Sequence, residues 1–380
     1  MRLLYTTILC ICLFTFCSGN DFPVFRNTIS FVKQGTEISS GDKNVSIASE
    51  LGTYQYDCDI YVERFRLETE FEVISDAPIL VYTGKTVGYM RFTSSEVRFY
   101  ESNDNQSGTV FHEMVNLPFQ LQSGGRYLAG VVKEADSVIF FLQEKETTGT
   151  NARIFKQIYR NFEDYQQTLL WGKPFFTIET GDIHIVRSTI TTRHDAPILS
   201  IFGDSFVEGN LLSIHGARKD FRWCSLVAER LGADNVLIDG KGGERMSESF
   251  FNRFKTENNW YRTPYVIIAL GTNNNLDFDE YTTWMEKTIA HLKSNGQTPI
   301  LVTVTPRKDY DFATTGARIN EWVKNSGERY IDVHQAVTEK GNPAEWRKGL
   351  VMYDGIHPTP AGYQAIFDRL KIDLSGLMGF

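Results

Sequence analysis

Three side chains that together can break an ester bond occur far apart in this sequence: Ser205, Asp354 and His357. A serine hydroxyl is a poor nucleophile until a base takes its proton, and the imidazole of His357 can be that base. Asp354 lies three residues before the histidine, where its carboxylate can hold the ring in one tautomer and stabilise its cation. These residues predict acyl transfer through a Ser-His-Asp triad.

Acyl transfer also requires hydrogen-bond donors for the negative charge that develops on the carbonyl oxygen. The candidates for this oxyanion hole are the backbone N–H groups of Ser205 and Gly243 and the side-chain amide of Asn273. Gly243 has no side chain that would block an approaching substrate. Asp204, next to the nucleophile, is assigned a role in stabilising the turn.

The candidate residues follow predicted strands or precede a predicted helix. From residue 195 onward, apolar strands alternate with helical segments, which predicts a doubly wound parallel sheet with right-handed crossovers. The predicted strands are Ile198–Phe202, Val236–Ile238, Tyr265–Leu270, Ile300–Val304 and Tyr330–Val333, and the predicted helices are Arg222–Leu231, Glu280–Ser294, Gly316–Asn325 and Ala361–Leu370. Ligands of such sheets bind beyond the carboxyl ends of the strands, where the candidate residues occur.

The first half of the chain has a different pattern, in which short alternating apolar runs are separated by turn residues. The runs include Tyr61–Val73, Ile79–Tyr82, Val97–Tyr100, Tyr127–Val132, Ser137–Leu142 and Phe175–Ile178. Many short strands at this spacing predict an antiparallel β-sandwich. The rhythm is similar to that of laminin-G and concanavalin-like jelly rolls. A boundary near Thr192–Pro197 gives a β-sandwich domain over residues 21–194 and a parallel-sheet domain over residues 195–380.

The N-terminus is typical of an export signal. Arg2 supplies a positive charge, and Leu3 to Phe16 form an apolar run that is too short to span a bilayer, so a signal peptide over residues 1–19 is favoured over a transmembrane segment. The expected location is therefore secreted or extracytoplasmic. An alternative is a lipid anchor on Cys17, as in a bacterial lipoprotein, although the bulky Phe16 departs from the small residue usual at such a site.

The composition argues against several other classes of protein. Hydrophobic residues make up 42% and charged residues 23% of the 380 residues, which is typical of a soluble globular protein. The formal net charge is −8 and no basic patch is present, so no nucleic acid partner is expected. The histidines occur singly and without paired cysteines, so no metal or other cofactor is predicted. Only Cys58 and Cys224 lie beyond the signal, which argues against a disulfide framework.

Taken in order, four blocks of this sequence resemble those that name the SGNH (GDSL) hydrolase family. The blocks are Gly203-Asp204-Ser205, Gly243, Gly271-Thr272-Asn273 and Asp354-x-x-His357. The resemblance covers roughly Pro197 to the C-terminus and implies a flavodoxin-like sheet and an esterase, lipase or deacetylase without metal or cofactor. Two details depart from the family: Gly240-Lys241-Gly242-Gly243 leaves open which glycine supplies the N–H, and the third block reads Gly-Thr-Asn-Asn where Gly-x-Asn-Asp is common.

Other motifs carry less weight. The Gly-x-Ser-x-Gly elbow of α/β-hydrolases would need glycine at Val207. His334, predicted at the end of a strand, is interpreted as a structural histidine in preference to one that lines the site. Trp223, Trp260 and Tyr261 could form a wall on which sugars stack, but core packing is the preferred interpretation.

The sequence as a whole predicts an exported carbohydrate esterase that removes acetyl or similar small acyl groups from a glycan. The expected partner is an acylated carbohydrate or another small ester. The esterase part of this prediction rests on the four blocks, and the glycan part on the export signal, the β-sandwich and the resemblance to two-domain carbohydrate esterases. Three alternatives stay open: a lipase or lysophospholipase, a glycan O-acetyltransferase, and a glycan-binding protein whose SGNH domain is inert.

Overall fold

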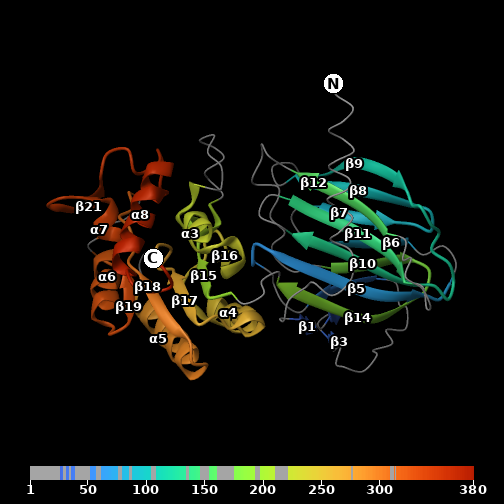
Figure 1. Cartoon of the computed structure of the whole chain (residues 1–380), viewed down its shortest axis with the longest axis horizontal. Coiled ribbons are helices and arrows are strands. Elements are labelled where there is room, and N and C mark those ends of the chain that lie inside the picture. The colour runs from blue at the N-terminus through green and yellow to red at the C-terminus, as the bar shows by residue number, and fades with distance from the viewer. Residues whose placement is uncertain are drawn as a thin grey trace.

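The computed structural model places two parts next to each other, one with helices around a parallel sheet and one built from antiparallel strands (Figure 1). It describes residues 26–28, 31–33, 36–38, 52–56, 61–75, 79–84, 88–103, 108–133, 137–145, 154–160, 175–192, 197–209, 221–274, 277–308, 312 and 314–380. The predicted signal peptide with Cys17, the thiol of Cys58 and the centre of the predicted boundary lie outside these residues, as does the side chain of Trp260.

The parallel sheet has five strands in the order β16-β15-β17-β18-β19. The strands are β15 (Leu199–Gly203), β16 (Val236–Gly240), β17 (Tyr265–Ala269), β18 (Thr298–Val302) and β19 (Arg329–Ile331). This order, with the first strand placed between the second and third, is the flavodoxin-like one. The predicted doubly wound α/β class is therefore confirmed. Every residue of β15 is buried, as expected for a strand covered on both faces.

Helices cover both faces of this sheet. They are α2 (Ser205–Glu208), α3 (Trp223–Leu231), α4 (Glu248–Tyr261), α5 (Phe278–Ser294), α6 (Gly316–Asn325), α7 (Val333–Val337) and α8 (Pro360–Asp373), with a short η4 (Ala233–Asn235). Apolar residues of α4, α5 and α6 belong to one buried cluster, and those of α3, α7 and α8 to another. The helices α4, α5, α7 and α8 each begin at a side-chain cap: Ser247, Asp277, Asp332 and Thr359.

Two details of the helices and strands differ from the prediction. Helix α4 was not predicted, because its three asparagines, Asn252, Asn258 and Asn259, interrupt the helical pattern with a residue of low helix propensity. His334 does not end a strand, since β19 stops at Ile331 and the Asp332 side chain caps α7, which contains His334. A short hairpin of β20 (Thr338–Glu339) and β21 (Asn342–Trp346) follows α7.

The N-terminal part consists of two antiparallel sheets. One has the order β1-β14-β5-β10-β11-β12 and the other β3-β2-β4-β13-β6-β7-β8-β9. The strands of the first sheet are β1 (Arg26–Thr28), β5 (Phe65–Val73), β10 (Arg126–Lys133), β11 (Ser137–Lys145), β12 (Ile154–Arg160) and β14 (Ile183–Thr192). Those of the second are β2 (Phe31–Lys33), β3 (Thr36–Ile38), β4 (Gly52–Tyr56), β6 (Ile79–Gly84), β7 (Gly88–Phe92), β8 (Glu96–Asn103), β9 (Gly108–Asn116) and β13 (Phe175–Thr180).

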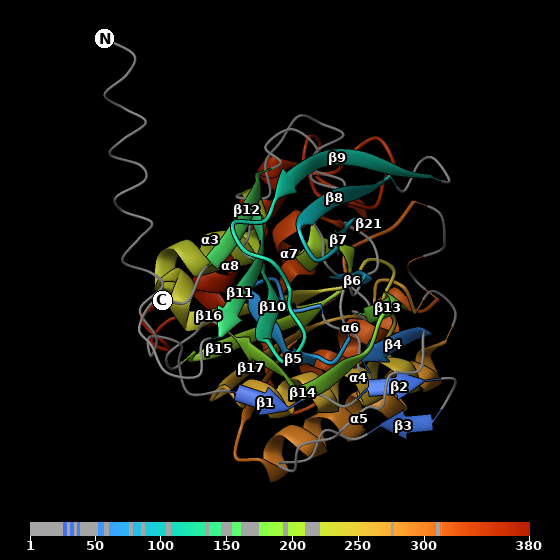
Figure 2. The same ribbon diagram turned by 90° about the vertical axis from the view of Figure 1, so that its right-hand side faces the viewer.

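The two antiparallel sheets pack against each other through buried aromatic residues. Phe71 of β5 lies 6.0 Å from Phe92 of β7, measured between ring centroids, and 5.7 Å from Tyr127 of β10. Figure 2, which faces this part, shows the strands of both sheets in front of the parallel-sheet part. This arrangement is the one expected of a β-sandwich.

Residues 61–64, predicted as the start of a sandwich strand, instead contact the parallel-sheet part. Val62 forms an antiparallel bridge with Asp239 at the edge of β16, and the Glu63 N–H donates to the Ile238 carbonyl at 2.8 Å. Strand β5 begins only at Phe65, and in Figure 1 this blue strand starts beside the parallel-sheet part. Val62 is buried in an apolar cluster with members from both parts.

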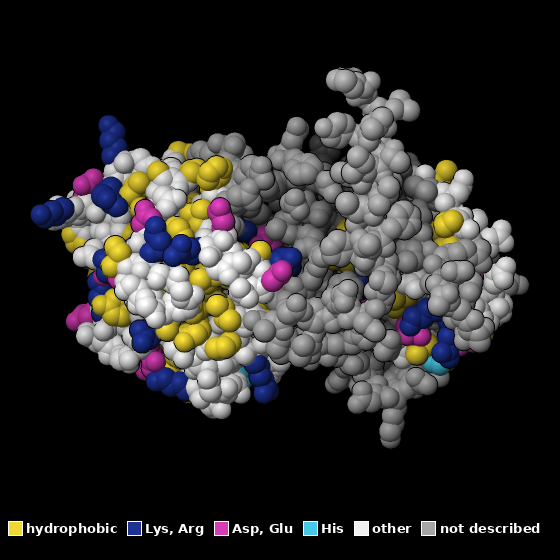
Figure 3. Space-filling view, viewed as in Figure 1, with side chains coloured by type: hydrophobic (Ala, Val, Ile, Leu, Met, Phe, Trp, Pro, Cys, Tyr) yellow, Lys and Arg dark blue, Asp and Glu magenta, His cyan; other side chains and the backbone are white. Residues whose placement is uncertain are grey.

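The described surface of the parallel-sheet part carries Lys and Arg interspersed with Asp and Glu and with apolar side chains (Figure 3). No helix in the described ranges is long and apolar enough to cross a membrane.

Candidate active site

Ser205 is the first residue of α2, a single helical turn directly after β15. The Asp204 side chain caps this turn by accepting a hydrogen bond from the Phe206 N–H at 3.0 Å, which is the turn-stabilising contact that the sequence predicts for it. Gly240, at the end of β16, lets α2 lie close to the sheet: a Cβ at this position would be 2.4 Å from the Glu208 nitrogen. The strand ends therefore fix the backbone of the nucleophile candidate.

The structure brings the three predicted triad residues into one hydrogen-bonded chain. Ser205 Oγ lies 2.8 Å from His357 Nε2, and His357 Nδ1 lies 2.7 Å from Asp354 Oδ2. Ser205, Asp354 and His357 are all partly exposed, so both solvent and a substrate can reach them. With the Nδ1 proton held by the carboxylate, Nε2 is left with the lone pair that can accept the serine proton.

Asp354 is held in its charged form by its own loop. Its partial burial opposes ionisation, but it accepts hydrogen bonds from the Ile356 N–H, the His357 ring and the His357 N–H, and these together lower its pKa below the ordinary value. A carboxylate that stays ionised can stabilise an imidazolium beside it.

The oxyanion-hole candidates follow the ends of β15, β16 and β17, which are neighbours in the parallel sheet. Among the described residues, neither the Ser205 N–H nor the Gly243 N–H donates to a protein acceptor, so both remain available to a ligand. Gly243 is exposed and has a φ of 74°, a left-handed conformation that glycine adopts without strain. The Asn273 amide donates to the Glu244 carbonyl at 2.9 Å and only weakly to Asp204 Oδ2, at 3.4 Å. The Asn273 amide therefore makes one short and one long hydrogen bond.

Arg307 is a neighbour of the site that the sequence analysis did not single out. Its Nη1 donates to the Thr272 carbonyl at 2.9 Å and to Asn273 Oδ1 at 3.3 Å. Because a guanidinium can only donate, the amide oxygen of Asn273 faces Arg307, and the amide N–H groups point the other way. The signal that would have identified it is its place just after the predicted strand Ile300–Val304, at the same edge of the sheet as Asn273.

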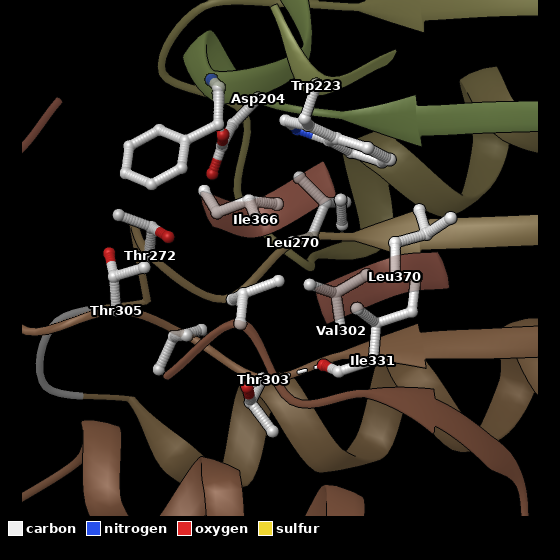
Figure 4. A pocket seen from close by; sticks show the side chains of 14 residues that line it. Asp204, Trp223, Leu270, Thr272, Val302, Thr303, Thr305, Ile331, Ile366 and Leu370 are labelled. Atoms are coloured by element: carbon white, nitrogen blue, oxygen red, sulfur yellow. Dashed lines mark hydrogen bonds between the residues drawn. The ribbon is translucent and has the colours of Figure 1, made fainter. Parts of the chain in front are cut away.

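A cavity of about 20 Å³ lies behind the nucleophile turn (Figure 4). Asp204, Thr272 and Thr305 form its polar side, and apolar residues such as Leu270 and Val302 line the rest. This volume is the size of one water molecule. Burial at this place raises the pKa of Asp204 to about 7, although Arg307 and the Phe206 N–H act in the opposite direction.

The other sequence candidates lie elsewhere. His334 donates to or accepts from no triad residue; its Nε2 is 2.7 Å from the Pro343 carbonyl and its ring stacks on Phe312. Trp223 and Tyr261 are buried in the core. Cys224 is a buried free thiol. Within the described ranges, no group of three or more His, Cys, Asp or Glu side chains is arranged to hold a metal ion.

Comparison with known proteins concerns the parallel-sheet part. Residues 201–365 match the GDSL-like lipase/acylhydrolase family. No curated protein matches the sequence. Solved structures with a similar fold include TesA, at 17% identity and a TM-score of 0.39, over 47% of this chain and 97% of that one.

Two further solved structures are similar at the same level. A GDSL-like lipase from Bacteroides thetaiotaomicron VPI-5482 has 19% identity and a TM-score of 0.36, over 46% of this chain and 85% of that one. Axe2, an acetylxylan esterase from Geobacillus stearothermophilus, has 16% identity and a TM-score of 0.36, over 48% of this chain and 94% of that one. The match to the GDSL-like lipase/acylhydrolase family, over residues 201–365, spans most of the parallel-sheet part.

Proposed function

We propose that this protein is an exported carbohydrate esterase that removes acetyl or similarly small acyl groups from a glycan, with Ser205 as nucleophile, His357 as general base and acid, and Asp354 as the group that orients His357. The observation that carries the proposal is the unbroken chain of contacts from Ser205 Oγ through His357 to Asp354, at 2.8 and 2.7 Å.

In the first half of the reaction, Ser205 Oγ attacks the ester carbonyl carbon while its proton passes to His357 Nε2. The Ser205 and Gly243 N–H groups and the Asn273 amide donate to the oxygen on which negative charge develops. As the tetrahedral intermediate collapses, the imidazolium gives its proton to the leaving hydroxyl of the sugar. The acyl group is then bonded to Ser205 Oγ.

In the second half, water enters in place of the sugar. His357 Nε2 takes a proton from this water, whose oxygen attacks the acyl carbonyl, and the same donors again face the oxyanion. Collapse of the second intermediate returns the proton to Ser205 Oγ and releases the carboxylic acid. Arg307, through its bond to Asn273 Oδ1, keeps the amide N–H groups directed to the same place in both halves.

The domain organisation favours an acylated polymer over a lipid as the substrate. The predicted signal peptide and β-sandwich are typical of proteins that act on polymers outside the cell. We propose that the sandwich, residues 21–194, lies at or beside the substrate cleft of the hydrolase domain, residues 195–380.

The test uses the wild-type protein and Ser205→Ala. It measures the hydrolysis of p-nitrophenyl esters of increasing chain length, acetate release from an acetylated oligosaccharide, and fatty-acid release from a lysophospholipid. We expect fast release from the acetate ester and the acetylated sugar, little from the octanoate ester, and none above background from the variant.

Other outcomes would point to the alternatives. Preference for octanoate and for the phospholipid ester would favour a lipase or lysophospholipase. Transfer of acetyl to an added sugar in preference to water would favour an O-acetyltransferase. A wild-type protein that releases nothing but binds the glycan would favour a binding protein with an inert hydrolase domain.

A further inference from the structure

Arg222 is a buried arginine that connects three segments of the molecule. Its Nη1 donates to the carbonyls of Val207 and Glu208, at 2.9 and 3.0 Å, which are the last two residues of α2. Its Nε donates to Ser225 Oγ in the first turn of α3. Its Nη2 donates to both carboxylate oxygens of Glu63, at 2.9 and 3.1 Å.

The Glu63 carboxylate comes from the other part of the molecule. Residues 62 and 63 pair with the edge strand β16, so the backbone next to Glu63 is fixed by the Val62–Asp239 bridge and by the bond from the Glu63 N–H to Ile238. The side chains of Arg222 and Glu63 are only 3% and 9% exposed. A buried guanidinium requires an opposite charge in a defined geometry, and the bidentate contact supplies it.

We propose that the N-terminal part completes the active site, with Glu63 acting through Arg222 as a positioning residue for Ser205; this inference rests on the proposed role of Ser205 as nucleophile. Helix α2 is one turn long, and its two ends are held by different contacts. Asp204 holds the N-terminal end, and the Arg222 guanidinium, fixed by Glu63, holds the C-terminal end.

The stem of Arg222 packs against the end of α2. Gly209 ends the turn with a φ of 70°, and a Cβ there would be 2.2 Å from Arg222 Cδ. The arginine stem thus fills the space next to the end of α2. If the guanidinium loses its partner and turns away, the carbonyls of Val207 and Glu208 lose their donor, and the turn that carries Ser205 can shift relative to His357.

A small shift of this kind acts on the chemical step. The Ser205–His357 contact is 2.8 Å, and proton transfer and attack depend on this geometry to within about 1 Å. A positioning role therefore lowers kcat with little change in KM, whereas a purely structural role lowers only the stability of the fold.

The segment that contains Glu63 also contacts residues that hold Asn273, the proposed oxyanion donor. The Arg253 guanidinium lies 4.7 Å from the centre of the Tyr61 ring, and it donates to Glu244 at 3.0 Å. The Glu244 carbonyl accepts the bond from the Asn273 amide. The segment 61–63 thus contacts groups that hold both the nucleophile turn and the predicted oxyanion donor.

The experiment compares the full-length wild-type protein with Glu63→Gln, Glu63→Asp and Arg64→Ala. Glu63→Gln keeps the shape of the side chain but removes its charge, and Glu63→Asp keeps the charge on a shorter stem. Arg64→Ala is the matched control, because Arg64 pairs with Asp234 in the same interface but contacts neither α2 nor Arg222 in the bonds described above. For each variant, kcat and KM for p-nitrophenyl acetate, the rate at which a fluorophosphonate labels Ser205, and the melting temperature are measured.

We expect Glu63→Gln to lower kcat and the labelling rate by about tenfold or more with KM changed less than about twofold, because the nucleophile is misplaced but the substrate site is intact. Glu63→Asp recovers part of this loss, and Arg64→Ala stays within about twofold of the wild type, as an exposed ion pair contributes little. If Glu63→Gln does not fold, the comparison is made with Glu63→Asp at a temperature at which it is folded.

Two results would overturn the inference: a folded Glu63 variant with wild-type kcat and labelling rate, or an equal loss in Arg64→Ala. Failure of the proposed function looks different, since the wild-type protein would then neither hydrolyse the ester nor be labelled at Ser205, or Ser205→Ala would keep full activity. If the wild type is active, Ser205→Ala is inactive and Glu63→Gln is unaffected, the protein acts as an esterase through Ser205. Only the positioning role of Glu63 is then wrong.

Discussion

The two sides of the candidate active site are built in different ways. On one side, Asp354 and His357 lie in a partly exposed loop whose contacts are mainly short-range. The Met352 N–H donates to the His357 carbonyl, and Asp354 accepts from the Ile356 N–H and from the N–H and ring of His357. On the other side, Ser205 and Asn273 are held by buried residues that include Asp204, the neighbour of Ser205, and, from distant segments, Glu244 and Arg222.

Because of this difference, substitutions in the loop of Asp354 and His357 should lower activity without lowering stability. Substitutions on the nucleophile side, around Ser205 and Asn273, should lower both. A loop held by local hydrogen bonds can lose a catalytic side chain without disturbing the core. The nucleophile side contains buried charges that compensate one another, so removing one leaves another unpaired, at a cost of about 3–5 kcal/mol. Variants on the two sides should therefore differ in stability even where they lose similar activity.

The largest expected effect is that of His357→Ala. The loss of the general base should lower kcat/KM by on the order of 10³-fold or more, about as much as the loss of Ser205, because the two residues act as a unit. The melting temperature should change little. The matched control is His334→Ala, which removes a histidine that stacks on Phe312 and bonds to the Pro343 carbonyl. His334→Ala should lower the melting temperature and leave kcat unchanged. A loss of kcat in His334→Ala with an unchanged melting temperature would contradict this prediction.

The next effect in size is that of Asn273→Ala, on the nucleophile side. If Asn273 is the oxyanion donor that we propose, its removal should lower kcat by on the order of 10²-fold with little change in KM, since the amide would then act on the transition state. This variant also loses the bond to the Glu244 carbonyl, so its melting temperature should fall, unlike that of His357→Ala. Steady-state kinetics and thermal unfolding of the same samples give both numbers. A rise in KM alone would show that Asn273 binds the substrate ground state instead.

The smallest effect concerns pH and the two aspartates, whose pKa values shift in opposite directions. Burial raises the pKa of Asp204 to about 7, whereas hydrogen bonds lower that of Asp354. Because folded Asp204 keeps its proton up to about pH 7 and the unfolded residue loses it near pH 4, this residue makes the free energy of unfolding fall as pH rises between these values.

Asp204→Asn should remove this slope, because an amide does not titrate, and its oxygen can still accept the hydrogen bond from the Phe206 N–H. The variant should therefore gain stability relative to the wild type, by roughly 2 kcal/mol, as the pH rises from about 4 to about 8. Asp354→Asn should have the opposite sign, with its cost present at neutral pH and disappearing as pH falls through the lowered pKa of Asp354. Melting temperatures between about pH 4 and pH 8 test the Asp204 prediction, and measurements continued below about pH 4 test that for Asp354. Parallel curves for Asp204→Asn and the wild type in the upper range would contradict the burial effect.

The sequence was sufficient to predict the parallel sheet and the residues at its carboxyl edge, because buried parallel strands are continuous apolar runs and each block follows one of them. The contacts of the nucleophile side were not predictable in the same way. Glu63 and Arg222 are 159 positions apart, and nothing local marks either as part of a buried pair. The run Tyr61–Val73 is continuous in sequence, so its first residues were assigned to the sandwich, although they pair with β16.

In the proposed mechanism, Ser205 carries the acyl group. The direct test is to mix the protein with p-nitrophenyl acetate, quench the reaction in acid during turnover, and map the modified peptide by mass spectrometry, with Ser205→Ala and His357→Ala as parallel samples. We expect one acetyl group on Ser205 in the wild type, none in Ser205→Ala, and much slower acetylation in His357→Ala. Acetylation at another residue that persists in Ser205→Ala together with turnover would contradict it.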